Sequence, residues 1–207
     1  MDSFQIKYKS GNIYKGSIKV RVILSEIKKI REGYGRMLYK DGSKYEGEYL
    51  NDKRNGFGIF TNEIGKIVYK GYWKNNKKEG IGIGKDDDGS IYEGEWSNNK
   101  KQGIGVYRLI DGYKYMGEFK NNIREGYGII YARNLDQYEG QWRNDRVNGI
   151  GVCYYHEGFT YVGNWRYGLK EGFGKLIAED GTEKVGEWRY GMFLKDIKEK
   201  YDRCIIF

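Results

Sequence analysis

The 207-residue chain contains no proline, two cysteines and one histidine. Absence of proline fits a continuous ladder of β-strands, because proline lacks the backbone N–H that a ladder needs. Two cysteines exclude a disulfide framework as the main source of stability. The single His156 leaves too few partners for a histidine-rich zinc site or a histidine-based catalytic triad. Because no segment approaches about 18 consecutive apolar residues, no membrane-spanning helix is expected.

Glycine, tyrosine and tryptophan, in contrast, recur in a fixed pattern with a period of 23 residues. A tyrosine opens each repeat, a glycine follows two positions later, and a large apolar residue follows two positions after that. All five tryptophans close this Tyr-x-Gly-x-Trp motif or a near variant of it. The opening and closing rings are Tyr45, Tyr49, Tyr69, Trp73, Tyr92, Trp96, Tyr115, Phe119, Tyr138, Trp142, Tyr161, Trp165 and Trp188.

The second half of each repeat carries paired glycines, as in Gly56-Phe57-Gly58. Alternate residues of a strand share a face, and a ring can lie flat on a glycine that has no Cβ. Pairs such as Asn75-Asn76 and Asp88-Gly89 suit two-residue hairpin turns. Two turns in every 23 residues leave no room for a helix within a repeat. The sequence therefore predicts an all-β fold, an elongated single-layer antiparallel meander of stacked β-hairpins.

The motif, the paired glycines and the period together resemble the MORN repeat (membrane occupation and recognition nexus) from Tyr14 to about Met192. The family usually has glycine three residues after the tryptophan. Here Gly168 and Gly191 follow that rule, and the other repeats have Asn or Asp, which also tolerate positive φ. The resemblance implies a non-catalytic scaffold in a cytoskeletal, ciliary or membrane-associated assembly. It leaves open a second interpretation, the targeting portion of a larger enzyme.

The repeat divides the chain into three parts. Residues 1-13 form a partial N-terminal repeat or cap, residues 14-192 the array of about seven repeats, and residues 193-207 a C-terminal tail. An insertion at residues 19-31 is interpreted as an enlarged hairpin that covers the N-terminal edge, or as a partner-specific contact loop. Apolar residues at 194, 197, 201, 204 and 205 have helical spacing, which predicts a short C-terminal capping helix. A frayed or partner-bound tail is the alternative.

The net charge of +8 is distributed unevenly. Basic residues follow the Asn-rich turns, and equivalent turns of a stacked array share one edge. This edge comprises Lys53, Arg54, Lys77, Lys78, Lys100, Lys101, Arg124, Arg146 and Lys170. The opposite edge carries Asp41, Asp86, Asp87, Asp88, Asp111, Glu157 and Asp180. The basic edge predicts a phosphoinositide-containing membrane surface or an acidic protein as partner, and the charge asymmetry would allow a homodimer.

The aromatic lattice has two interpretations. It is either the apolar face of a thin sheet, or a groove whose floor of exposed rings binds a partner helix or an extended segment. We expect the array as a whole to bind a protein along this groove, with the rings named above as its contacts. No catalytic constellation, metal-ligand set or cofactor motif is found, and no nucleic-acid partner is expected. Because no secretory leader opens the chain, a cytoplasmic location is the default.

Overall fold

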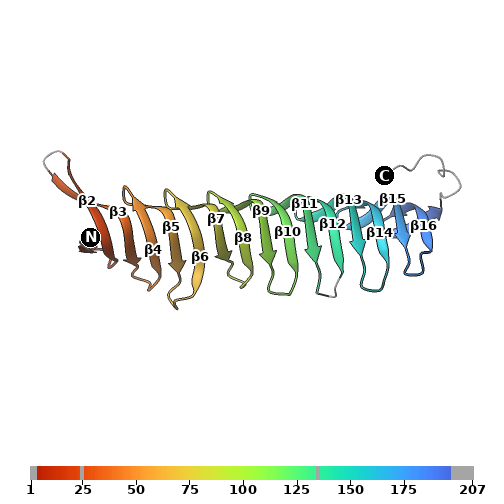
Figure 1. The fold of residues 1–207 in the computed structure, drawn as a ribbon, viewed down its shortest axis with the longest axis horizontal. Coiled ribbons are helices and arrows are strands. Elements are labelled where there is room, and N and C mark those ends of the chain that lie inside the picture. Colours follow the sequence, from red (N-terminus) through yellow and green to blue (C-terminus); the bar gives the residue numbers. More distant parts are fainter. Residues whose placement is uncertain (1–3, 24–25, 134–135, 197–207) are drawn as a thin grey trace. The chain divides into compact units, whose positions relative to one another are not determined.

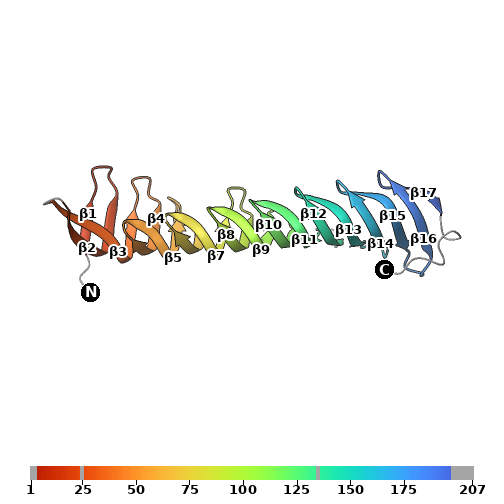
Figure 2. The same cartoon turned by 90° about the horizontal axis from the view of Figure 1, so that it is seen from above.

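The computed structural model describes residues 4–23, 26–133 and 136–196 of the chain. These ranges contain seventeen strands and no helix, which confirms the predicted all-β fold. The chain divides into two halves, Met1–Gln102 and Gly103–Phe207, and the boundary lies inside strand β9 (Lys100–Arg108). Within each half, consecutive strands pair antiparallel in chain order and form a single layer (Figure 1). Seen from above, the strands are bowed rather than flat (Figure 2).

The N-terminal half contains β1 (Phe4–Lys7), β2 (Ile13–Ile23), β3 (Glu26–Leu38), β4 (Lys44–Leu50), β5 (Lys53–Thr61), β6 (Ile67–Lys74), β7 (Lys77–Lys85) and β8 (Ile91–Ser97). The boundary strand is β9 (Lys100–Arg108). The C-terminal half continues with β10 (Lys114–Lys120), β11 (Ile123–Tyr131), β12 (Gln137–Arg143), β13 (Arg146–Tyr154), β14 (Thr160–Arg166), β15 (Leu169–Ile177), β16 (Glu183–Arg189) and β17 (Met192–Asp196).

The Asn-rich turns are two-residue hairpin turns, as predicted. Both central residues have positive φ, for example +48° at Asn51 and +64° at Asp52. The second turn residue also links its hairpin to the preceding repeat. The Asp52 N–H donates to the Arg31 carbonyl at 3.1 Å, and the Asp52 carboxylate accepts the Arg31 N–H at 2.9 Å. Asn or Asp at this position therefore supplies a hydrogen bond that glycine cannot make.

The Asp-Gly turns at the other end of the strands differ from that prediction. In the turn between β3 and β4, only Gly42 has positive φ, at +88°, and Asp41 does not. The Tyr39 N–H donates to the Ser43 carbonyl at 2.9 Å, and the Gly42 N–H donates to the Tyr39 carbonyl at 3.0 Å. These are three-residue loops that end in a left-handed glycine, not two-residue turns. The two kinds of turn lie along opposite margins of each half (Figure 1).

The two glycines of each Gly-x-Gly segment have different roles. Gly47 pairs with Gly58 and Tyr49 pairs with Arg54, so three residues of β5 bulge against the single Glu48 of β4. Gly56 lies in that bulge with φ of +97°, which a side chain would strain. Gly58 lies under a ring, since a Cβ built on it would be 2.3 Å from the Tyr45 hydroxyl oxygen. The prediction that rings lie on glycine is therefore right for the second glycine, whereas the first serves the bulge.

The two ends of the array differ from the sequence interpretation. The insertion is an enlarged hairpin, because β2 and β3 pair from Ile18 with Arg31 to Ile23 with Glu26. It does not cover the edge strand β1, which pairs with β2 only from Ile13 to Gly16. The first three residues of the predicted capping helix, 194–196, belong to strand β17. The rest of that prediction, residues 197–207, lies outside the described residues.

Candidate interaction surface

The core of each half is a ladder of aromatic rings on one face of the sheet. Within each half, an opening tyrosine typically contacts the closing ring of its own repeat and that of the next repeat, edge to face. Tyr69, for example, has its centroid 5.0 Å from Trp73 and 5.3 Å from Trp96. In the C-terminal half Tyr161 lies 5.1 Å from Trp165 and 5.2 Å from Trp188. Such pairs stabilise a fold beyond the area that they bury.

Hydrogen bonds fix the orientation of these rings. The Tyr45 hydroxyl donates to the carbonyl of Glu48, the residue that faces the bulge, at 3.0 Å. Every opening tyrosine from Tyr14 to Tyr161 makes the equivalent bond to the residue three positions on. The indole Nε1 of Trp73 donates to the carbonyl of Gly58 at 3.2 Å, and the other four tryptophans bond alike. The opening tyrosines and the tryptophans thus find backbone partners for their buried polar atoms, whereas the Tyr49 hydroxyl has none among the described residues.

Basic side chains cover the rings on the side that points away from the sheet. The Arg54 guanidinium lies 4.1 Å from the Trp73 centroid, and the Lys78 ammonium lies 4.5 Å from that of Trp96. Burial lowers the pKa of Lys78, because it removes water from the ammonium group. Cation–π attraction and the aliphatic stems together close the ring face to solvent.

The lattice is consequently not an open groove. The opening tyrosines are 0–5% exposed and the closing rings 3–8% exposed. The rings expected to contact a partner, Tyr45, Tyr49, Tyr69, Trp73, Tyr92, Trp96, Tyr115, Phe119, Tyr138, Trp142, Tyr161, Trp165 and Trp188, are all in this buried set. The rings are therefore core in this structure, since neighbouring repeats and basic side chains cover them.

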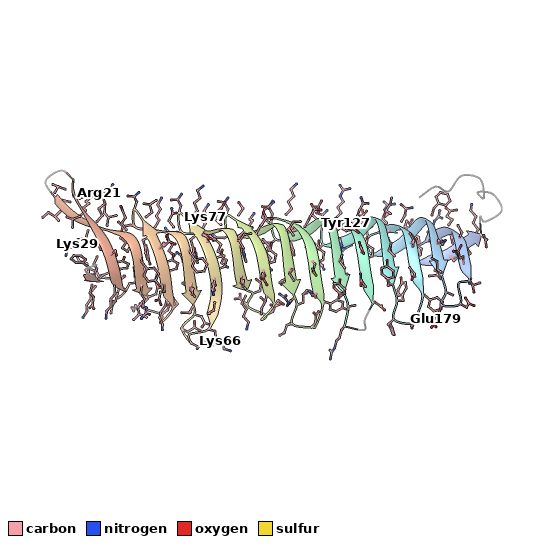
Figure 3. All side chains as sticks on the ribbon, in the orientation of Figure 1. Arg21, Lys29, Lys66, Lys77, Tyr127 and Glu179 are labelled. Carbon is pink, nitrogen blue, oxygen red and sulfur yellow. The ribbon has the colours of Figure 1, made fainter. Side chains whose placement is uncertain are left out.

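The predicted basic edge separates into two groups. Lys53, Lys77, Lys100 and Arg146 are exposed next to the Asn-rich turns, where Lys77 points away from the sheet (Figure 3). The other members of the edge have their charged groups over rings, namely Arg54, Lys78, Lys101, Arg124 and Lys170. The side chains of the first group do not cover the ring ladder.

The acidic edge consists partly of turn-stabilising side chains. The Asp41 carboxylate accepts the Ser43 N–H at 2.9 Å, and Asp88 accepts the Ser90 N–H at 2.8 Å. The hydrogen bonds from Ser43 and Ser90 lower the pKa of these two carboxyls. Lys66, in a loop at the same margin, adds positive charge there (Figure 3). This margin is therefore mixed in charge, and its aspartates have a local structural role.

The opposite face of the sheet, which we call the outer face, exposes apolar side chains. The residue between the paired glycines points to this face and is aromatic or aliphatic in seven successive repeats. Its exposure is 39–64% throughout. The row consists of Tyr34, Phe57 and Ile81 in the N-terminal half and of Ile104, Tyr127, Ile150 and Phe173 in the C-terminal half.

Other apolar residues lie beside this row, although its members also face polar residues, such as Glu118 opposite Ile104. In the C-terminal half, Met116 pairs with Val106 on one side and with Ile129 on the other. Farther along, Val152 pairs with Val162. All of these are half-buried or exposed, and they lie on the same face as the row. Exposed apolar side chains that gather on one face are a candidate interaction site.

Acidic residues hold the row in place. The Glu48 carboxylate accepts the Phe57 N–H at 2.9 Å, and Glu118 accepts the Tyr127 N–H at 2.7 Å. The Tyr127 hydroxyl donates to Glu139 at 2.6 Å. This bond raises the pKa of Tyr127 to about 12, because ionisation would place two negative charges together.

The sequence did contain a signal for the outer face. Residue x of every Gly-x-Gly pair is apolar and none is charged, although the chain is 32% charged. That bias has no explanation in ring-on-glycine packing, because x points away from the rings. The prediction rested on the rings, which are the most apolar residues of the repeat but are buried.

The described part of the chain contains no cluster of metal-binding side chains. Groups of three or more His, Cys, Asp or Glu residues with metal-binding geometry are not found there. His156 lies beside a turn with its Nδ1 2.9 Å from an Asp136 carboxylate oxygen. Cys153 is buried, and burial raises its pKa. No helix capable of crossing a bilayer occurs among the described residues.

Comparison with known families agrees with this geometry. MORN repeats are matched at residues 28–44, 45–66, 69–90, 92–112, 115–136, 138–160 and 161–183, which is more than half of the chain. The chain belongs to the MORN-repeat family. Seven matched MORN repeats correspond to the hairpins that carry the ring ladder. The resemblance inferred from the motif spacing is thus confirmed.

Individual similar proteins are more distant. Protein TIC 100 of Arabidopsis thaliana is 33% identical over 63 residues, a stretch that covers 30% of this chain and 7% of that protein. The TCP domain of Drosophila melanogaster SAS-4 (dCPAP), solved with a proline-rich motif of Ana2 (dSTIL), has a TM-score of 0.34 at 14% identity and 90% coverage of both chains. The TCP10 domain of Danio rerio CPAP has a TM-score of 0.31 at 9% identity, with 93% of this chain and 98% of that one covered. Scores this low bear on neither fold nor partner.

Proposed function

We propose that this chain is a non-catalytic protein-interaction module, and that its partner lies along the outer face of the MORN array. The observation that carries the proposal is the row of exposed apolar side chains between the paired glycines. MORN repeats are in general a non-catalytic module of protein interaction or membrane association. A scaffold in a cytoskeletal, ciliary or membrane-associated assembly is the setting that we propose for it.

The geometry of a sheet supports a long, narrow partner. The row advances by one repeat, or two strands, at a time, which is about 10 Å per step. The three row residues of the N-terminal half, or the four of the C-terminal half, would each contact one apolar side chain of a helix or an extended segment, so affinity would accumulate from several modest contacts. The rigid support of each row residue, which lies between a bulge and a buried ring, would reduce the ordering cost of binding.

The test compares two variants in which exposed isoleucines are replaced by glutamine. Ile81→Gln with Ile150→Gln changes the outer face, at residues 59% and 64% exposed. Ile64→Gln changes a residue in the loop after β5 that is 66% exposed and does not belong to the face. Both variants should keep the circular dichroism and thermal transition of the wild type, because none of these side chains is buried.

Each protein would be used as bait in an extract of its native cells, with bound proteins quantified by mass spectrometry. Proteins held by the wild type and by Ile64→Gln, but lost by the outer-face double variant, would support the proposal. A reciprocal pull-down with the recovered protein, purified, should repeat that order. Equal recovery by all three baits would contradict it, and loss with both variants would show that the outer face has no special part.

A further inference from the structure

The last two two-residue turns of the array carry tyrosine where the five before them carry asparagine. Tyr167 has a φ of +53° and Tyr190 a φ of +51°. This left-handed conformation suits Asn or Gly and disfavours a tyrosine. The two rings are 61% and 70% exposed, so they add little to the packing of the sheet. Folding therefore does not explain why these two positions are aromatic, and strained positions of this kind often serve a function.

Hydrogen bonds hold these turns in a fixed order beside the Asn144-Asp145 turn. The Gly168 N–H donates to the Val147 carbonyl at 2.9 Å, and the Gly191 N–H donates to the Lys170 carbonyl at 3.0 Å. Each acceptor lies in the strand that follows the preceding turn. Successive turns are thereby set one repeat, about 10 Å, apart. They follow one another along one margin of the C-terminal half (Figure 1).

Exposed arginines flank the three turns. Arg143 pairs directly with Arg146 across the first turn, although like charges opposite one another destabilise a sheet. Each of the next two turns has one arginine, and none of the four forms an ion pair within the described ranges. We refer to the arginines and the two turn tyrosines together as the arginine patch, which consists of Arg143, Arg146, Arg166, Tyr167, Arg189 and Tyr190.

Nearby carboxylates interact with the body of the array rather than with the patch arginines. Asp145 forms an ion pair with Arg124 at 3.1 Å. The Glu125 carboxylate accepts the Asn144 N–H at 2.9 Å, and Glu171 accepts the Tyr190 N–H at 3.0 Å. The four guanidinium groups are therefore available to an external anion.

Exposed apolar groups separate the arginines of successive turns. Leu169 pairs with Arg166 and is 47% exposed, and Met192 pairs with Arg189 and is 63% exposed. The Tyr167 ring lies 5.5 Å from the Arg166 guanidinium carbon and 6.0 Å from that of Arg146. Arginine binds a carboxylate through two parallel N–H···O bonds, and arginine and tyrosine dominate many protein interfaces. A fitting ligand has acidic and apolar groups in turn along one line.

We propose that the arginine patch binds an acidic, extended segment of a partner protein in polyproline II conformation, with an acidic residue at every third position. This conformation rises about 3.1 Å per residue with three residues per turn, so every third side chain recurs on one side after about 9 Å. The protein turns recur after about 10 Å, so each turn meets one carboxylate. A β-strand would place every third residue on the opposite side. The patch is separate from the outer-face row, so the inference does not rest on the proposed function.

The test measures fluorescence anisotropy of a labelled peptide made of three Glu-Pro-Leu triplets, with the full chain as titrant. A peptide of equal composition with its glutamates adjacent should bind at least about threefold more weakly, because it reaches fewer turns. Arg166→Gln with Arg189→Gln should weaken binding of the triplet peptide about tenfold, since each exposed ion pair contributes about threefold. Arg166→Lys with Arg189→Lys keeps the charge and should weaken it about threefold, because lysine lacks the planar fork.

Tyr167→Asn with Tyr190→Asn separates binding from folding. Asparagine is the residue of the earlier turns and tolerates positive φ, so this variant should resist urea at least as well as the wild type. It should nevertheless bind the triplet peptide at least about fivefold more weakly, because two exposed rings are lost.

The matched control is Lys53→Gln with Lys77→Gln, which removes two exposed charges from the equivalent margin of the N-terminal half. It should bind the triplet peptide within about twofold of the wild type. An equal loss in this control would show that net charge alone drives binding, and it would overturn the proposal. So would equal affinity for the two peptides, unchanged binding by the tyrosine variant, or no binding at about 1 mM peptide. Tighter binding of an oligothymidylate or of phosphatidylserine vesicles, weakened by the same variants, would assign the patch to phosphates instead.

Failure of this proposal is distinguishable from failure of the protein-interaction proposal. Ile81→Gln with Ile150→Gln leaves the arginine patch unchanged, so this variant should bind the triplet peptide like the wild type. The tyrosine variant, in turn, should retain the proteins that bind the outer face.

Discussion

Gly128→Ala is the sharpest test of the ring ladder as the core. A Cβ at Gly128 would lie 2.3 Å from the Tyr115 hydroxyl oxygen and 2.5 Å from two ring carbons, where contact requires about 3.5 Å. Tyr115 is fully buried, with its centroid 5.2 Å from Phe119 and 5.1 Å from Trp142. The ring must therefore shift by about 1 Å and lose its hydrogen bond to the Glu118 carbonyl.

The cost follows from those two losses. Overpacking costs about 1–3 kcal/mol and a lost buried hydrogen bond about 1 kcal/mol, so Gly128→Ala should destabilise the C-terminal half by roughly 2–4 kcal/mol. Gly168→Ala is the matched control, because its φ is +86° but no atom lies within 4 Å of the added Cβ. It should cost only about 1 kcal/mol of backbone strain. Urea unfolding followed by circular dichroism measures both.

A double-mutant cycle separates the clash from other effects. Combining Gly128→Ala with Tyr115→Leu removes the ring that the Cβ would strike, so the two changes should be less than additive by about 1–2 kcal/mol. Equal destabilisation by Gly128→Ala and Gly168→Ala would refute the reasoning. So would full additivity of the double variant.

Two further predictions concern tyrosine hydroxyls. Tyr45→Phe should lower the free energy of unfolding in urea by about 1 kcal/mol, because it removes the hydrogen bond to Glu48. Tyr49→Phe should be neutral or stabilising, since the buried Tyr49 hydroxyl has no partner among the described residues. The reverse order would contradict the assignment. Burial raises the pKa of Tyr14 and Tyr92 to about 12, so stability is complete below about pH 10 and should fall as pH rises toward about 12. Loss of circular dichroism should accompany the last part of the rise in tyrosinate absorbance, and complete ionisation of all 21 tyrosines with unchanged circular dichroism would refute this.

The repeat made the strands, the Asn-rich turns and the position of rings over glycine predictable. Alternation along the strands places Tyr45 and Gly58 on one face. Asn at both central positions suits a two-residue turn, which requires positive φ there. The bulge at Gly56 was not predictable, because alternation treats both glycines of a pair alike. The Asp41-Gly42 turn was assigned the wrong type, since Asp-Gly occurs in two-residue and in three-residue loops.

The exposure expected of the rings was the larger error. Alternation shows which residues share a face, but it does not show which face is covered. Coverage arises from neighbouring repeats and from the Arg54 and Lys78 side chains that lie over Trp73 and Trp96. In the sequence these basic residues are indistinguishable from exposed Lys53 and its equivalents. Their position over the rings follows only from the stacking of one hairpin on the next.

The central claim is that the rings are core and that the outer face is the accessible apolar surface. Hydroxyl-radical footprinting of the free chain, read by mass spectrometry, tests it residue by residue. Tyr127 and Phe173 on the outer face should be oxidised faster than Trp142 and Trp165, although tryptophan is intrinsically a highly reactive side chain. Faster oxidation of the two tryptophans would contradict the account, because it would place the ring lattice at the surface.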